Sequence, residues 1–430
     1  MPFSEDVLNE RRARVASALE LDNAILVIGA GAPIPLPEGT DQTYPYRAHA
    51  EFFYLTGLEC PHAVLAFDPQ DGAKTGWRCF VPSVTEDERV WEGRAQPPGE
   101  RLDQFAAWLG SRRHRPIVGL GASIPQVERD PIRSHHVREL FHHTRRIKDP
   151  AEIELLRRVA SATAAGYRAI QPHLYAGITE RALQIELEAA FARAGGARTG
   201  YGTIVGIGSN AAILHFEPSA RAAREGEFVL IDAGAEIDRY VCDVTRTYVI
   251  GAASGFQHDL YQIVLDVHRR AINRCRAGRE WKDVHLRAAT ELTEGLIALG
   301  LLRGDAESLV EQEAHLLFFP HGLGHLVGLG VRDASGTEPG RTKDPRPSLR
   351  NLRTDLPLRP GYVITVEPGL YFIRPLLEDP ARRERFRSAI DWDRVDQHLD
   401  VGGVRIEDNV LVTEGDPEVL TEAIPKGLQP

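Results

Sequence analysis

Five side chains that can ligate metal ions lie in short segments typical of strands or tight turns. They are Asp232, Asp243, His325, Glu367 and Glu407, and the acids follow or interrupt β-branched, apolar runs. Acids in such runs point into a protein interior, where an unpaired charge is very costly. Four acids close together would repel one another and take up protons unless cations lay between them. We therefore predict a site for two divalent metal ions, in which the histidine completes the ligand shell.

The types of ligand restrict the metal and the chemistry. Oxygen-rich ligation with one imidazole suits Mn²⁺, Co²⁺ or Fe²⁺ at least as well as Zn²⁺. Five ligands for two ions imply bridging carboxylates, and such metal pairs lie about 3.5–4 Å apart with a hydroxide between them. Residues 233–242 are compatible with a turn, so a strand–turn–strand ribbon can bring Asp232 and Asp243 to one patch of sheet. Any one acid is compatible with a salt-bridged core residue, but the set favours a two-metal hydrolase.

The segment from His321 to His325 needs separate treatment, because two histidines four residues apart also occur in a helical zinc motif. That motif has a glutamate after the first histidine, which is missing here. Gly322 and Gly324 would also weaken a helix. We predict a loop or strand edge that requires close approach of the backbone.

Composition excludes several classes of protein. A chain of 430 residues with 43% hydrophobic residues predicts two globular domains. The formal net charge of −10 argues against a nucleic-acid binder. No run approaches roughly 18 consecutive apolar residues, and the N-terminus is acidic without an apolar core, so we expect a cytoplasmic protein with no membrane span. The four cysteines are far apart without a C-x-x-C pair, which indicates free thiols.

The elements that must position the site divide at residue 149. Before it we expect helices at 4–20, 101–110 and 130–142, and strands at 24–28, 64–68 and 79–82. Asp149, Pro150 and Glu152 form a capping-box sequence that starts a helix reaching about 171, and Thr179 starts another reaching Arg193. Further on we expect strands at 202–207, 227–232, 239–248, 361–366, 369–373 and 403–412, and helices at 256–276, 283–299 and 305–314. The prediction is an α+β protein, with an α/β domain at 1–145 and a curved antiparallel sheet at 146–430.

The motifs resemble those of the aminopeptidase P and prolidase family, the metallopeptidases of the pita-bread fold. They lie in the family's order at 44–57, 203–216, 231–248, 318–331, 366–373 and 402–409. The resemblance implies an N-terminal α/β domain, a catalytic pita-bread domain and hydrolysis of the bond between an N-terminal residue and proline. It also implies two metal ions, most typically Mn²⁺ with Co²⁺, Zn²⁺ or Fe²⁺ as alternatives.

The resemblance assigns catalytic roles position by position. The five ligand positions match the family's metal ligands, with Asp243 and Glu407 bridging. Glu367 would also carry a proton from the nucleophile to the leaving proline nitrogen. His215 matches a histidine near the tetrahedral intermediate, where it would stabilise the oxyanion. His321 matches a second histidine that lines the proline pocket.

The same resemblance assigns residues that bind substrate or support the ligands. Arg405 matches an arginine that orients the last carboxylate, and Arg353 matches a prolidase arginine that binds the free carboxylate of the substrate. The other matching positions are Tyr201, Tyr371, Arg145, and the N-terminal-domain residues Asp41 and Trp91, which in aminopeptidase P reach a neighbouring subunit's site. We therefore expect a homodimer or homotetramer.

The chain departs from the family at one position. The family carries a histidine in GLxVHD, where this chain has Arg332 in GLGVRDA. That histidine helps to hold the substrate carbonyl. We expect activity to survive, either because arginine supplies a permanent cation or because it turns outward.

Several functional alternatives stay open. The long segment between Phe372 and Gly403 and the presence of Arg353 resemble prolidases, so we predict an Xaa-Pro dipeptidase. The alternative is an aminopeptidase P that acts on longer peptides, which the N-terminal domain favours. Organophosphate hydrolysis is a conceivable side activity, because organophosphorus acid anhydrolases resemble prolidases. A non-catalytic peptide-binding module on the same fold is the alternative from another class, and the complete ligand set argues against it.

Overall fold

The first unit of the chain is an α/β layer built on one mixed sheet. The computed structural model describes residues 2–37, 39 and 41–429, and the chain divides into compact units at 1–145 and 146–430. The first unit contains α1 (Glu5–Ala18), β1 (Ile25–Gly29), α2 (Ala50–Thr56), β2 (Val64–Phe67), β3 (Trp77–Val81), α3 (Glu86–Glu92), β4 (Glu100–Arg101), α4 (Phe105–Gly110), β5 (Ile117–Gly121) and α5 (Pro131–Arg146).

Strand order in this sheet is β4-β3-β2-β1-β5. β1 pairs parallel with β5 and antiparallel with β2, and it is buried along its whole length, as its unbroken apolar run requires. The predicted helix at 101–110 begins only at Phe105, because β4 and a 3₁₀ turn occupy residues 100–104. Short elements such as α2 and β5 carry too little periodicity to be found in the sequence.

The first helix of the second unit begins at the predicted capping box. The Asp149 carboxylate accepts a hydrogen bond from the Glu152 backbone N–H at 2.9 Å, and the Glu152 carboxylate accepts one from the Asp149 N–H at 3.0 Å. Pro150 occupies the first turn. Its helices are α6 (Pro150–Ile170), α7 (Glu180–Arg193), α8 (Gly255–Asn273), α9 (Trp281–Ala298), α10 (Ala306–Glu311), α11 (Pro347–Arg350), α12 (Arg374–Leu377), α13 (Pro380–Arg385) and α14 (Trp392–Asp396).

The strands of this unit are β6 (Arg198–Thr199), β7 (Ile204–Ile207), β8 (Phe228–Asp232), β9 (Ala235–Ile237), β10 (Tyr240–Val241), β11 (Thr245–Val249), β12 (Gly336–Thr337), β13 (Thr354–Asp355), β14 (Val363–Val366), β15 (Gly369–Tyr371), β16 (Gly403–Arg405), β17 (Asp408–Leu411) and β18 (Glu418–Val419). They pair antiparallel in the orders β11-β8-β7, β10-β9-β6, β14-β17-β18 and β15-β16, while the short pair β12-β13 is parallel. The predicted α+β architecture is confirmed.

Two strands that the sequence predicts as continuous are interrupted in the structure. The segment 239–248 breaks between β10 and β11, and the segment 403–412 breaks between β16 and β17. Asp243 and Glu407 lie in these two breaks. The acidic residues inside these two apolar runs therefore lie where the strand pairing is interrupted.

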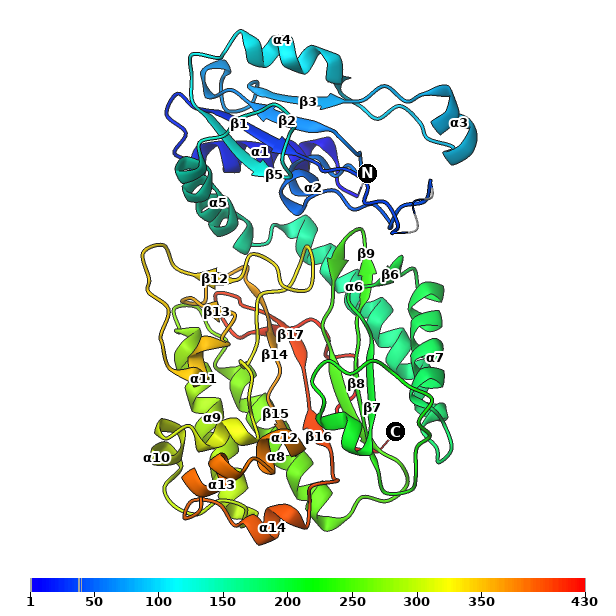
Figure 1. Ribbon diagram of the computed structural model, residues 1–430, viewed down its shortest axis with the longest axis vertical. Helices are drawn as coiled ribbons and strands as arrows, with labels where there is room; N and C mark the ends of the chain where they lie inside the picture. The colour runs from blue at the N-terminus through cyan, green and yellow to red at the C-terminus, as the bar shows by residue number, and fades with distance from the viewer. Residues whose placement is uncertain (1, 38, 40, 430) are drawn as a thin grey trace. The chain divides into compact units, whose positions relative to one another are not determined.

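Helices cover the sheets on both sides. α6 and α7 stand together along one side of the unit, and α8, α9 and α10 pack along the other (Figure 1). An extensive apolar core joins α8 and α9 to β14 and β17, with Trp281 and Tyr362 buried in it. Among the described residues, no helix combines the length and apolar character needed to cross a membrane. The four cysteines are free, as predicted.

Candidate metal centre and active site

The first two acids reach the site from neighbouring strands. Asp232 ends β8 and pairs with Thr245 of β11. Between Asp232 and Asp243 the chain leaves the sheet as the β9–β10 hairpin, which turns at Asp238 and Arg239 with positive φ values of 49° and 74°. The sequence predicted a simple turn between the two acids, whereas the structure has a two-stranded hairpin there. The hairpin returns so closely that a Cβ on Gly234 would lie 1.8 Å from the Cys242 carbonyl oxygen.

His325 is placed by a loop that runs along β14. The His325 N–H donates to Thr365 Oγ1 at 3.0 Å, and the Thr365 N–H donates back to the His325 carbonyl at 2.8 Å. A Cβ on Gly324 would lie 1.9 Å from the Thr365 carbonyl oxygen, so only glycine permits this approach. The Glu367 N–H continues the pairing by donating to Leu323. The predicted loop with close backbone approach is confirmed.

Glu407 and Asp243 are held by polar neighbours. Thr245 Oγ1 donates to Glu407 Oε2 at 2.7 Å, and the Glu407 N–H donates to the Thr245 carbonyl at 3.0 Å. The side-chain amide of Asn409 accepts from the Asp243 N–H at 3.1 Å and donates to the Asp243 carbonyl at 2.5 Å. Hydrogen bonds to their backbone groups thus hold both acids in place, so the carboxylate of Asp243 is available to bind a metal ion.

Three of the predicted ligands meet in one cluster. Ligand atoms of Asp243, His325 and Glu407 all lie within 4.8 Å of one another, and all three residues are buried. His325 Nε2 lies 3.4 Å from Asp243 Oδ2 and 3.9 Å from Glu367 Oε1. His325 Nδ1 lies 3.1 Å from the Leu326 carbonyl, which fixes the tautomer that presents Nε2 to the acids.

Asp232 borders this cluster and is held from outside it. Tyr201 donates its hydroxyl to Asp232 Oδ1 at 2.7 Å, and Arg405 Nη2 donates to Oδ2 at 2.6 Å. Glu367 is the most exposed of the set, with 18% of its side chain open to solvent. Both acids line the same cavity as the three clustered ligands.

The electrostatics of the set favour cations between the acids. Burial, together with the neighbouring carboxylates, raises the pKa of Asp232 and Glu407, and raises that of Glu367 to about 7. Burial would lower the pKa of His325, but Asp243 and Glu367 outweigh it and raise that pKa. Carboxylate oxygens with one imidazole form a donor set that fits divalent ions of the Mn²⁺, Co²⁺, Fe²⁺ and Zn²⁺ group. The residues present therefore fit the implied metal pair.

A chain of hydrogen bonds runs from the acids to His321. Arg405 donates to Asp232, to Thr245 Oγ1 at 2.9 Å and to the Tyr371 hydroxyl at 2.9 Å. The Tyr371 hydroxyl lies 2.9 Å from His321 Nε2, and His321 Nδ1 lies 2.8 Å from the Gly322 carbonyl. Burial and the charge of Arg405 lower the pKa of His321 to about 3. His321 is therefore a neutral ring with both nitrogens engaged, which suits a wall of the pocket.

One cavity of about 810 Å³ opens over the cluster. It is lined by all five predicted ligands and by Tyr201, His215, His321, Arg332, Arg353 and Arg405. His215, Arg332 and Arg353 are exposed within it, and no hydrogen bond or ion pair holds the guanidinium groups of Arg332 and Arg353 among the described residues. Tyr371 supports the lining from behind, through Arg405.

The remaining predicted residues lie in the first unit. The Arg145 guanidinium lies over the rings of Tyr54 and Phe141, at 5.3 and 5.8 Å from their centroids. Asp41 is exposed, and Trp91 on α3 is 83% exposed.

Sequence reasoning missed the hydroxyl groups that hold the ligands. Thr245 and Thr365 are fully buried and bond directly to the site. The alternation of Thr245 and Thr247 along β11 is the signal that was available, since both point to the same side of the strand.

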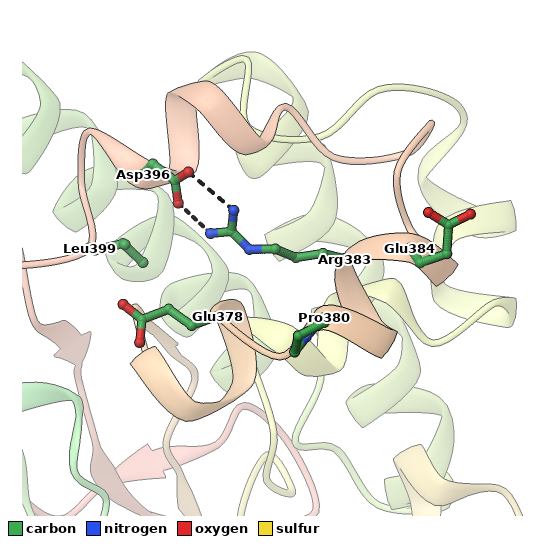
Figure 2. Close-up of a pocket in the computed structure, with 6 residues that line it drawn as sticks. All are labelled: Glu378, Pro380, Arg383, Glu384, Asp396 and Leu399. Carbon is green, nitrogen blue, oxygen red and sulfur yellow. Dashed lines mark hydrogen bonds and ion pairs between the residues drawn. The ribbon is translucent and has the colours of Figure 1, made fainter.

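A second hollow lies on the surface of the segment between Phe372 and Gly403. Figure 2 shows it between α12, α13 and α14, with Arg383 reaching across to Asp396. The ion pair is partly exposed, with 29% and 43% of the two side chains open to solvent. Its lining is Glu378, Pro380, Arg383, Glu384, Asp396 and Leu399. An exposed ion pair of this kind contributes little to the free energy of unfolding. We interpret the hollow as a surface depression without a functional role.

Family models, relatives of known sequence and solved structures all point to the same protein family. The model of metallopeptidase family M24 matches residues 154–414, and that of the aminopeptidase P N-terminal domain matches residues 8–108. A probable Xaa-Pro aminopeptidase of Pyrenophora tritici-repentis is 34% identical, covering 90% of this chain and 86% of that protein. The solved aminopeptidase PepP of Pseudomonas aeruginosa is 27% identical with a TM-score of 0.80, covering 99% and 96% of the two chains. Zinc-substituted Escherichia coli aminopeptidase P in complex with product is 26% identical with a TM-score of 0.79, covering 99% and 97%.

Proposed function

Because this chain belongs to metallopeptidase family M24, we propose that it is a metal-dependent Xaa-Pro aminopeptidase that releases the N-terminal residue from peptides with proline second. Its fold is the pita-bread fold of aminopeptidase P, preceded by an N-terminal α/β domain. The observation that carries the proposal is the buried cluster of Asp243, His325 and Glu407, flanked by Asp232 and Glu367 at the base of one cavity. We propose that residues 146–430 form the catalytic domain and residues 1–145 the aminopeptidase P-like domain.

The five ligands would hold two divalent ions, and Mn²⁺ is the ion we propose. Such a pair supplies a water of lowered pKa as nucleophile and polarises the scissile carbonyl. Glu367 is the residue placed to move the proton, because its side chain is the most exposed of the five ligands, at 18%, and it lines the cavity. His215 is exposed in the same cavity and is free to donate to the developing oxyanion.

The proline ring needs an apolar wall beside the metal ligands. His321 packs edge-to-face against Phe319 at 4.9 Å and against Tyr371 at 5.4 Å. Both ring nitrogens of His321 are already engaged, so the ring offers shape without a free donor. A rigid pocket of this kind favours the cyclic side chain of proline over flexible residues.

Substrate length is the finer part of the proposal. The relatives are named Xaa-Pro aminopeptidases and aminopeptidase P, which favours peptides longer than two residues over the dipeptides predicted from Arg353 and the long insertion. Arg332 and Arg353 are exposed cations in the cavity. They are suited to bind the carboxylate of a short peptide beyond the proline.

The experiment is a substrate series on the Mn²⁺-loaded protein. We expect Ala-Pro-Ala to be hydrolysed with a higher kcat/KM than Ala-Pro, and Ala-Ala-Ala to be left intact. Amidation of the tripeptide should raise KM if a carboxylate binds the arginines, and Arg353→Ala should abolish that difference. Faster hydrolysis of Ala-Pro would overturn the length preference. No hydrolysis of any Xaa-Pro peptide would overturn the activity itself.

The replacement at Arg332 is tested in the same series. Arg332→His restores the family residue, and we expect both forms to be active because the arginine is exposed and makes no contact with the ligands. If only the histidine form hydrolyses Xaa-Pro peptides, the arginine has removed an essential contact.

Two further proposals concern assembly and the non-catalytic alternative. We propose a homodimer or homotetramer, because Trp91 on α3 is a large apolar side chain left 83% exposed. Light scattering of the wild type and of Trp91→Ser tests this, and a wild-type monomer would exclude it. Failure to bind Mn²⁺, with no change in stability on adding a chelator, would instead favour a peptide-binding module.

A further inference from the structure

A buried ion network lies around Asp408, the first residue of β17, directly after Glu407. Asp408 is fully buried, and its carboxylate lies 2.8 Å from Arg246 Nη2, 3.1 Å from Lys426 Nζ and 3.2 Å from His268 Nε2. Successive side chains of a strand point to opposite faces, so Asp408 faces away from the metal cluster. The proposed mechanism makes no use of this network, although it adjoins a metal ligand.

Arg246 is the centre of the network. Its side chain is 1% exposed, and every edge of the guanidinium is occupied. Its hydrogen-bond acceptors are the carbonyls of Thr245, Glu407, Ile424 and Pro425 and the carboxylate of Asp408, at 2.7–3.0 Å. One rigid group therefore joins the backbone of a metal ligand to the C-terminal segment.

The C-terminal segment has a second route to the cluster. Thr421 Oγ1 donates to Asp408 Oδ1 at 2.7 Å and accepts from the Asn409 N–H at 3.0 Å. Asn409 is the residue whose side-chain amide bridges both backbone groups of Asp243. β18 adds a strand pairing between Val419 and Val410 of β17.

We propose that residues 418–426 position the metal ligands Asp243 and Glu407, and thereby set the affinity of the centre for divalent metal. The inference rests on the proposed metal centre. The segment is joined through Arg246, Asp408 and Asn409 to the backbone groups of the two acids, and it thereby fixes the positions from which their carboxylates reach a metal. Loss of groups that orient metal ligands typically weakens metal binding by about 10–100-fold.

The variants must loosen the segment without unfolding the protein. Replacing Arg246 would leave Asp408 and several carbonyls buried without partners, which is strongly destabilising. Lys426→Met keeps the aliphatic stem and removes one cation from Asp408. Thr421→Val keeps the shape of the side chain and removes the hydroxyl. Glu422→Gln is the matched control, because Glu422 is the exposed second partner of Lys426, at 3.0 Å.

The measurement is the dissociation constant of Mn²⁺ for the full-length, metal-stripped protein, read by electron paramagnetic resonance of free Mn²⁺. Circular dichroism establishes that each variant is folded. We expect Lys426→Met and Thr421→Val each to weaken Mn²⁺ binding by about tenfold or more. Glu422→Gln should stay within about twofold of the wild type, and Thr421→Ser should recover the affinity lost in Thr421→Val.

Unchanged Mn²⁺ affinity in both variants would overturn the proposal, and a lower melting temperature in that case would assign the segment to stability alone. Equal weakening by Glu422→Gln would also overturn it, because the effect would not run through Asp408. A wild-type protein that binds no Mn²⁺ would overturn the metal centre itself. Failure of this inference and failure of the proposed function are therefore distinguishable.

Discussion

Glu367 should lower the stability of the metal-free protein as the pH rises, by an amount that a variant at this position can isolate. Its pKa in the folded protein is raised from 4.5 to about 7, by burial first and then by the neighbouring acids. Between these two values the unfolded chain has released the proton while the folded protein retains it. The folded state then binds more protons, so the free energy of unfolding falls with increasing pH.

The magnitude follows from the same two values. A difference of about 2.5 in pKa corresponds to about 3 kcal/mol of stability, lost between pH 4.5 and pH 8. For a catalytic unit of this size that is about 5 °C in melting temperature. Glu367→Gln carries no ionisable group at this position, so its apoprotein should lose about 3 kcal/mol less than the wild type over the same range. Buried histidines such as His285 and His315 also change the free energy of unfolding with pH. Their contributions are the same in both proteins, so they cancel when the Glu367→Gln values are subtracted from those of the wild type.

The assay is urea unfolding of both metal-stripped proteins at pH 4.5, 6 and 8, followed by far-UV circular dichroism. With saturating Mn²⁺ the wild type should gain stability over its metal-free form as the pH rises, because the ligands must be deprotonated to bind and bound metal stabilises the folded state. Parallel pH dependences for the apo wild type and Glu367→Gln would refute the reasoning, since Glu367 would then not be desolvated among the acids.

Three further predictions follow from single contacts. Tyr371→Phe leaves Arg405 and His321 without the bridging hydroxyl, and we expect a loss of about 1–3 kcal/mol in urea unfolding, whereas no loss would mean that water replaces the hydroxyl. Gly324→Ala forces a Cβ against Thr365 and should abolish Mn²⁺ binding measured by calorimetry, whereas the control Gly255→Ala, with open space at its Cβ, should bind normally. Asp149→Ala removes the capping box of α6 and should cost about 1 kcal/mol of unfolding free energy, with unchanged Mn²⁺ affinity as its check.

Local signals located most long elements. The capping box at Asp149 placed the start of α6, and Thr179 placed the start of α7, because helix termini are specified by a few adjacent residues. The β9–β10 hairpin and the short elements of the first unit were missed, because segments of two to seven residues have little periodicity of their own. Their formation depends on partners far away in the chain.

The sequence alone indicated which residues are candidates for the chemistry, because four acids that each follow or interrupt an apolar run, with one histidine, are hard to explain together without a cation. Tertiary structure decided how those residues are held. Hydrogen bonds from Arg405 through the Tyr371 hydroxyl engage the His321 ring, which is neutral and lines the cavity. The two strands predicted as continuous are interrupted at Asp243 and Glu407. Tertiary structure also placed the C-terminal segment against Arg246, which bonds to the carbonyls of Ile424 and Pro425, more than 170 positions away. Spacing along the chain carries no information about such contacts, because hydrogen-bond partners are chosen by proximity in space.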